Sequence, residues 1–203
     1  VINIGRQLGS GGKEIGEKLA ARLGIDFYDK ELINLASEES GLCKEFFEKA
    51  DEKASQGIIG GLFGMRFPFI SEGAMPCNNC LSNDALFKVQ SDVIRHLAAE
   101  KSCVFVGRCA DYILEDIPNH LNVYVYAPDE ARLKNCVENL QMDPQTAKKM
   151  MRDVDAARNR YHKAYIPGWQ SVFDHKDLMI DSSRFGIDGT AKILADIVKN
   201  QWG

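Results

Sequence analysis

The sequence predicts one α/β domain in which a five-stranded parallel sheet is covered by helices on both faces. Two observations support this prediction. Short runs rich in β-branched residues alternate with longer segments of helical apolar spacing, which is typical of parallel sheets with helical crossovers. The 203 residues also have a globular composition, with 45% hydrophobic and 27% charged residues.

The predicted elements follow in order along residues 1–203. Apolar and β-branched runs predict strands at residues 1–4, 25–28, 103–106, 122–127 and 178–180. Apolar residues with helical spacing predict helices at residues 13–23, 30–36, 85–99, 129–140, 144–163 and 187–198. The first helix places Ile15, Leu19 and Ala20 on one face and ends at Gly24, a residue suited to a helix C-terminus.

Residues 41–84 interrupt this alternation. Between residues 56 and 82, glycines are mixed with apolar side chains without a steady period. A long connection of this kind in a compact domain is typical of a functional loop. We therefore expect a mobile insertion that folds over the functional site, and a helical hairpin with glycine-broken ends is the alternative.

The charge balance and the apolar runs exclude several classes of function. The chain has 25 Lys and Arg against 29 Asp and Glu, a net charge of -4, which argues against a broad nucleic-acid surface. No apolar run approaches the roughly 18 residues of a membrane span, and residues 1–20 lack a secretory signal pattern. We expect a cytoplasmic monomer or homodimer that binds neither nucleic acid nor membranes.

The six cysteines are expected to be free thiols in such a protein. Only Cys77 and Cys80 have the spacing of metal ligands, and no second pair of ligands follows them. The sequence therefore predicts no metal site made by protein ligands alone.

The most informative segment is a glycine-rich turn between the first strand and the first helix, G-R-Q-L-G-S-G-G-K-E at residues 5–14. A strand that leads through such a turn into a helix presents backbone N–H groups to a phosphate. The strict motif G-x-x-x-x-G-K-[ST] is not met, because Gln7 stands at its first glycine and Glu14 at its hydroxyl position. The candidate phosphate-binding residues are Arg6, Gly9, Ser10, Gly11, Gly12, Lys13 and Glu14.

This turn resembles that of the nucleoside monophosphate kinases, especially cytidylate kinase, which reads G-x-x-G-x-G-K-G-T. Four further segments resemble the family in family order: F-Y-D-K at 27–30, C-V-F-V-G-R-C-A-D at 103–111, R-D-V-D-A-A-R-N-R at 152–160 and L-M-I-D-S-S at 178–183. The turn together with G-R-C-A most resembles the cytidylate kinase-like family. The resemblance runs from residue 1 to about 195 and implies a three-layer, P-loop NTPase-like fold.

Two alignments of the turn with the family are possible. Without a gap, Lys13 matches the phosphate lysine, but Ile15 matches the threonine that meets magnesium. With one extra residue in the turn, the buried helix positions match, while Gly12 takes the lysine position and Glu14 the threonine position. We favour the second alignment, because a shift of one residue turns the apolar face of a helix by about 100°.

In this second alignment another cation must replace the missing lysine. Arg6 is the first candidate, since a longer turn would let its side chain fold back across Gly9 and Gly11. Lys13 is the reserve, although one position further along a helix points about 100° away.

The resemblance implies transfer of the γ-phosphoryl group of ATP, with Mg²⁺, to a small acceptor, by default a pyrimidine nucleoside monophosphate such as CMP. The resemblance also implies that residues 129–165 form a helical lid and that the insertion binds the acceptor. The implied catalytic residues are Arg152, Asp155 and Arg158, and the implied acceptor-binding residues are Asp29, Arg108 and Arg160. Mg²⁺ would arrive with ATP, with Glu14 as a candidate ligand.

Plainer alternatives stand beside these roles. Asp29 also suits a helix N-cap, and Arg152, Asp155 and Arg158 have the spacing of ordinary ion pairs on a solvated helix. The alternative function is a non-catalytic nucleotide-binding or regulatory module with a degenerate P-loop, because the lysine and threonine positions are lost. The arginine-rich lid favours the enzyme.

Overall fold

The computed structural model of the protein describes residues 1–39 and 83–202. Cys77 and Cys80 lie outside these residues, as does the predicted insertion at 41–84 except for its last two residues. Those two residues, Asn83 and Asp84, begin a long helix.

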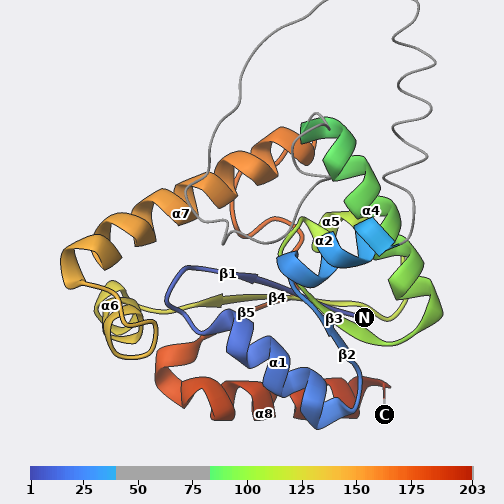
Figure 1. The fold of residues 1–203 in the computed structure, drawn as a ribbon. Helices are drawn as coiled ribbons and strands as arrows, with labels where there is room; N and C mark the ends of the chain where they lie inside the picture. Colours follow the sequence, from blue (N-terminus) through green and yellow to red (C-terminus); the bar gives the residue numbers. More distant parts are fainter. Residues whose placement is uncertain (40–82, 203) are drawn as a thin grey trace, which may run out of the picture.

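The centre of the fold is a five-stranded parallel sheet in the order β2-β3-β1-β4-β5, seen nearly edge-on in Figure 1. The strands are β1 (Ile2–Arg6), β2 (Asp26–Tyr28), β3 (Cys103–Val106), β4 (Leu121–Tyr126) and β5 (Leu178–Asp181). The predicted fold class is confirmed. β1 is longer than the predicted strand at residues 1–4, so Arg6 ends the strand instead of lying in the turn.

Helices cover both faces of this sheet (Figure 1). The helices are α1 (Gly12–Leu23), α2 (Lys30–Glu39), α4 (Asn83–Glu100), α5 (Ala110–Ile113), α6 (Asp129–Glu138), α7 (Pro144–Tyr165) and α8 (Ser182–Trp202). α1 and α8 lie on one face, while α2, α4, α5 and α7 lie on the other side. The sequence did not predict α5, and α8 begins five residues before the predicted helix at 187–198 because it includes a kink at Gly186.

The two faces of the sheet have different cores. Alternate residues of a strand point to opposite faces, and Ile2 and Ile4 of β1 pack in the cluster formed with α1 and α8. Asn3 and Gly5 therefore point to the opposite face, beneath α7. The face of α1 predicted from its spacing is the one that is buried, through residues such as Ile15 and Leu19.

Parallel strands end at one edge of the sheet, and the connections that follow β1, β2, β3 and β4 meet there. Ligands of such folds bind at this edge. Among the described residues, no helix is long and apolar enough to cross a membrane.

Candidate phosphate-binding site

The glycine-rich turn, residues 7–11, leaves the start of α1 open. Gly9 and Gly11 have φ angles of 81° and 75°, which favour glycine, and Gly11 is the N-cap of α1. Within the described parts of the chain, no side chain caps this helix, and the N–H groups of Gly12, Lys13 and Glu14 have no hydrogen-bond acceptor. These donors and the positive end of the helix dipole suit an anion.

Three side chains from two other elements hold the turn from outside. Each donates a hydrogen bond to a carbonyl of the turn: Arg132 Nε to Leu8 (2.8 Å), Asn135 Nδ2 to Gly9 (2.9 Å) and Ser182 Oγ to Ser10 (2.7 Å). The C=O and N–H of a trans peptide point in opposite directions, so the N–H groups that follow Leu8 and Ser10 point away from these side chains. The turn is thus held as a cradle of donors by α6 and α8.

The Arg6 side chain crosses the start of α1. A Cβ atom placed on Gly12 would lie 2.5 Å from Cβ of Arg6 and 2.9 Å from its Cγ, and a Cβ atom on Gly107 would collide with Nη1 of Arg6. The side chain therefore runs over Gly12 toward the end of β3. The expectation that it folds back across Gly9 and Gly11 is wrong, because Arg6 belongs to the strand.

Three arginines converge at this point, and we call Arg6, Arg108 and Arg158 the arginine cluster. Burial, followed by repulsion from Arg158 and Arg108, lowers the pKa of Arg6 to about 9, and the carboxylates of Asp29 and Glu31 oppose this less strongly. Neither Arg6 nor Arg108 forms an ion pair with any described carboxylate. The cluster thus has an excess of positive charge, which a bound anion would neutralise.

Arg108 is held in an unusual backbone conformation. Gly107, Arg108 and Cys109 have successive φ angles of 84°, 59° and 56°, a region that residues other than glycine rarely adopt. The Arg108 guanidinium lies 5.4 Å from the centre of the Tyr161 ring, and its buried Nε has no hydrogen-bond partner among the described residues. Strain of this kind is typical of ligand-binding positions.

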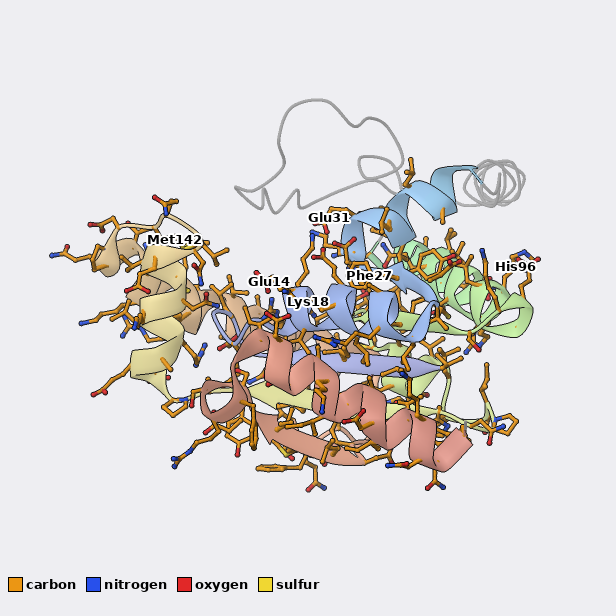
Figure 2. The ribbon with its side chains drawn as sticks, turned by 90° about the horizontal axis from the view of Figure 1, so that it is seen from below. Glu14, Lys18, Phe27, Glu31, His96 and Met142 are labelled. Carbon is orange, nitrogen blue, oxygen red and sulfur yellow. The ribbon has the colours of Figure 1, made fainter. Side chains whose placement is uncertain are left out.

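Lys13 points away from the turn, toward the end of β2. Its Nζ lies 2.6 Å from Oδ2 of Asp29, while Oδ1 of Asp29 accepts the N–H of Leu32 and so caps α2. Burial raises the pKa of Asp29, but the hydrogen bonds from Lys13 and Leu32 outweigh it and lower the pKa overall. The N-cap role proposed as the alternative for Asp29 is therefore present. Figure 2 shows Glu14 and Glu31 in the first turns of the helices that follow Gly11 and Asp29.

Asp155 links the predicted lid to the turn. Its Oδ1 accepts the Leu8 N–H at 2.8 Å and lies 3.3 Å from Nη1 of Arg158, while its Oδ2 accepts a hydrogen bond from Arg132. Nη1 of Arg158 also donates to the carbonyl of Arg6 at 3.0 Å. The predicted pair of Asp155 and Arg158 thus reaches the turn.

Arg132 was not predicted from the sequence. Its side chain is only 6% exposed, and it bonds both Asp155 and the turn. The one sequence signal for it is its spacing of three residues from Asp129, with which it forms an ion pair at 3.1 Å. Such spacing is common on solvated helices and could not identify it.

The other two predicted arginines of α7 lie elsewhere. Arg152 and Arg160 are exposed and do not line the cavity that Arg158 lines. On a helix, Arg152 is turned by about 120° from Arg158, which explains the separation.

A cavity of about 430 Å³, including the space that opens to solvent, lies beside the arginine cluster. It is bounded by Gly5, Arg6, Gly107, Tyr124, Asp155, Arg158, Asn159, His162, Trp169, Val172 and Lys176. This outer cavity thus joins the end of β1 to α7 and the segment that follows it.

The described residues contain no group of three or more His, Cys, Asp or Glu side chains that could hold a metal ion. Glu14, in the first turn of α1, is one carboxylate beside the open helix start. Mg²⁺ is commonly bound by one or two carboxylates together with substrate phosphates. A carboxylate at this position suits a magnesium ion that arrives with a nucleotide.

Comparisons with known proteins agree with this architecture. An uncharacterized protein from Eubacterium ventriosum ATCC 27560 is 24% identical, with a TM-score of 0.70 over 98% of this chain and 97% of that chain. The shikimate kinase from Bacteroides thetaiotaomicron is 10% identical, with a TM-score of 0.50 over 98% of this chain and 97% of that chain. These similarities show a P-loop NTPase-like fold.

No curated protein sequence matches the chain. The sequence profile of the cytidylate kinase-like family matches residues 1–184, which include every element up to the start of α8. This match supports a phosphotransferase. The chain belongs to the cytidylate kinase-like family.

Proposed function

We propose that the protein is an ATP-dependent phosphotransferase that binds the ATP phosphates at the glycine-rich turn and transfers the γ-phosphoryl group to a small acceptor. The observation that carries this proposal is the arginine cluster beside the open start of α1. Phosphoryl transfer requires positioned substrates and groups that neutralise the charge of the moving phosphoryl. The N–H groups of the turn and the guanidinium groups of the cluster meet both requirements.

The contacts of each residue suggest how the work is divided. Arg6 passes over Gly12 and ends at Gly107, so it lies between the turn and the end of β3 and takes the place of the missing P-loop lysine. Arg108, at the end of β3, binds the anionic group of the acceptor. Arg158 is linked to the turn through Asp155, and its guanidinium is the second one that stabilises the charge of the moving phosphoryl group.

The remaining candidates have supporting roles. Asp29 fixes Lys13 and the start of α2 at the acceptor side of the turn. Mg²⁺, when bound with ATP, neutralises phosphate charge, and Glu14 is the residue that would hold it. Arg152 and Arg160 are exposed on α7, and we expect them to contribute less than Arg158.

The proposed acceptor is a pyrimidine nucleoside monophosphate such as CMP. The family assignment supports this choice, and the outer cavity offers aromatic side chains, Tyr124 and Trp169, beside the arginines. A pocket with apolar walls and a few charged groups is typical of sites for small ligands. From the sequence we also propose that the protein is cytoplasmic and is a monomer or a homodimer.

A regulatory module that binds nucleotides without catalysis is the second candidate. Two points favour it: the alignment that we favour puts Gly12 at the lysine position, and the Asp155 carboxylate already accepts the N–H of Leu8. An anionic side chain that reaches the turn from α7 competes with phosphate for the donors of the turn.

The test is to incubate the protein with ATP, Mg²⁺ and a panel of nucleoside monophosphates, and to measure ADP. We expect ADP with at least one pyrimidine nucleotide, a loss of roughly 100-fold in Arg158→Ala, and a much smaller loss in Arg152→Ala, its exposed control on the same helix. ATP binding by calorimetry without ADP formation for any acceptor would instead support the regulatory module.

A further inference from the structure

A second cavity, of about 190 Å³ including the space that opens to solvent, adjoins the outer cavity on the face of the sheet beneath α7. Its walls are Asn3, Ile4, Gly5, Gly107, Asp111 and His162. Gly5, Gly107 and His162 also line the outer cavity, so the two spaces are neighbours. We call this second space the inner cavity.

Asn3, in the wall of the inner cavity, has a buried hydrogen-bond acceptor that no described residue satisfies. The residue is 2% exposed, and its Nδ2 donates to Oδ1 of Asn122 at 2.7 Å. Its Oδ1 has no partner within residues 1–39 and 83–202. Alternation along β1 points Asn3 to the same face as Gly5, where the cavity lies. A buried acceptor without a donor is unfavourable and calls for a partner from a ligand or from water.

His162 supplies a second acceptor. Its Nδ1 lies 2.8 Å from the carbonyl oxygen of Arg158, and because a carbonyl only accepts, Nδ1 carries the hydrogen. Burial lowers the pKa of His162, so the ring is neutral at pH 7. Nε2 of a neutral ring with a protonated Nδ1 is an acceptor.

The charged wall residue of the inner cavity, Asp111, is paired with Lys176, which lines the outer cavity. Lys176 forms an ion pair with Asp111, and the two side chains are 5% and 9% exposed. Nζ of Lys176 also donates to the carbonyl of Asp174 at 3.0 Å. The acceptors that remain are Oδ1 of Asn3, Nε2 of His162 and the second carboxylate oxygen of Asp111, whereas the nearby arginine cluster offers donors and positive charge.

We propose that the inner cavity binds the neutral end of the phosphoryl acceptor and selects acceptors that carry a hydroxyl or amine group opposite their anionic group. This inference rests on the proposed function, which makes the ligand of the inner cavity the phosphoryl acceptor. An anion at the arginine cluster leaves the rest of the molecule free to extend past Gly5 and Gly107. A hydroxyl or amine there donates to Asn3 or His162, whereas a carbonyl in its place leaves both acceptors unpaired.

Calorimetry with two matched pairs of ligands tests this selection. CMP has an amine at C4 of its base, whereas UMP has a carbonyl at C4 and an N–H at N3, and glycerol 3-phosphate and propyl phosphate differ by hydroxyl groups alone. The donor-bearing members are CMP, through its C4 amine, and glycerol 3-phosphate. We expect the donor-bearing member to bind roughly 5-fold or more tightly in at least one pair, as one or two hydrogen bonds provide. A preference in the nucleotide pair identifies a base amine as the donor, and a preference in the other pair identifies hydroxyl groups.

Variants connect the preference to the cavity. His162→Phe and Asn3→Leu should each reduce the ratio of the two affinities within a ligand pair to below about 2-fold, with little change in the affinity for inorganic phosphate. His120→Phe is the matched control, because its Nδ1 lies 2.7 Å from the carbonyl of Ile117 but the residue precedes β4, at the opposite edge of the sheet. The wild-type ratios test the proposal even where a variant does not fold.

Equal affinities within both pairs, or a preference that survives both variants, would overturn the inference. Failure of the proposed function gives a different result. In that case the donor-bearing ligands bind more tightly, but no acceptor yields ADP with ATP and Mg²⁺. ADP formation without any preference for donor-bearing acceptors leaves the phosphotransferase intact and rejects the inner cavity as its selecting element.

Discussion

The Arg6 side chain occupies the space in which a side chain at position 12 would begin. A Cβ atom on Gly12 would lie 2.5 Å from Cβ of Arg6, far inside van der Waals contact. Position 12 is where our alignment expects the phosphate lysine of related kinases. Arg6 at the end of β1 thus fills the space of a side chain at position 12, and we expect the phosphate-binding cation to come from the strand and not from the helix.

Replacing Arg6 tests this arrangement. Arg6→Ala should weaken ATP binding by roughly 1.5 to 3 kcal/mol, the range of a hydrogen bond to a charged group. Arg6→Lys should restore part of the affinity, because the amine lacks the planar fork of a guanidinium. Lys13→Ala is the control, since Lys13 is held by Asp29 and should change ATP affinity little. The opposite ranking in calorimetry would make Lys13 the phosphate lysine and the gapless alignment correct.

Moving the cation provides a stricter test. Gly12→Lys alone should lower both the unfolding temperature and ATP affinity, because its Cβ collides with Arg6. Combining it with Arg6→Ala removes the collision and supplies a lysine at the start of α1. The double variant should therefore bind ATP more tightly than either single variant. Additive losses would show that Arg6 and Gly12 do not share this space.

The link between α7 and the turn should contribute to stability. Asp155→Asn removes the negative charge that faces Arg132 and Arg158, and Arg132 is nearly buried. We expect a loss of about 1 to 3 kcal/mol in the free energy of unfolding by urea. Asp153→Asn, an exposed neighbour without an ion pair to any described residue, should lose less than about 0.5 kcal/mol. Similar values for both variants would mean that the link does not stabilise the fold.

His162 should make stability depend on pH. Burial lowers its pKa below the ordinary 6.5, while the carbonyl of Arg158 and the charge of Asp111 oppose this, and Lys176 and Arg6 add to it. The unfolded chain then binds more protons than the folded one just below pH 6.5, so stability falls as the pH falls through this window. Urea unfolding at pH 7, 6 and 5 should show a larger decline for the wild type than for His162→Gln. Parallel declines would contradict this prediction.

The sequence alone determined the architecture. Alternating strand and helix periods predicted a parallel sheet, because apolar spacing reports directly which residues a strand or helix buries. The face of α1 followed from Ile15, Leu19 and Ala20, and the same periodicity selected the alignment with Gly12 at the lysine position. The order of short motifs indicated the family that the comparison then identified.

The contacts of the site were decided only by the tertiary structure. Periodicity shows which residues share a helix face, but not how that helix is rotated or placed over the sheet. For this reason the predicted residues Arg152, Asp155 and Arg158 separate, although they share one helix. Asp155 and Arg158 line the cavity, and Arg152 is exposed at the surface. Arg132 had no distinctive motif, because its partners Leu8 and Asp155 are distant in sequence. Its role exists only where α6, α7 and the turn meet.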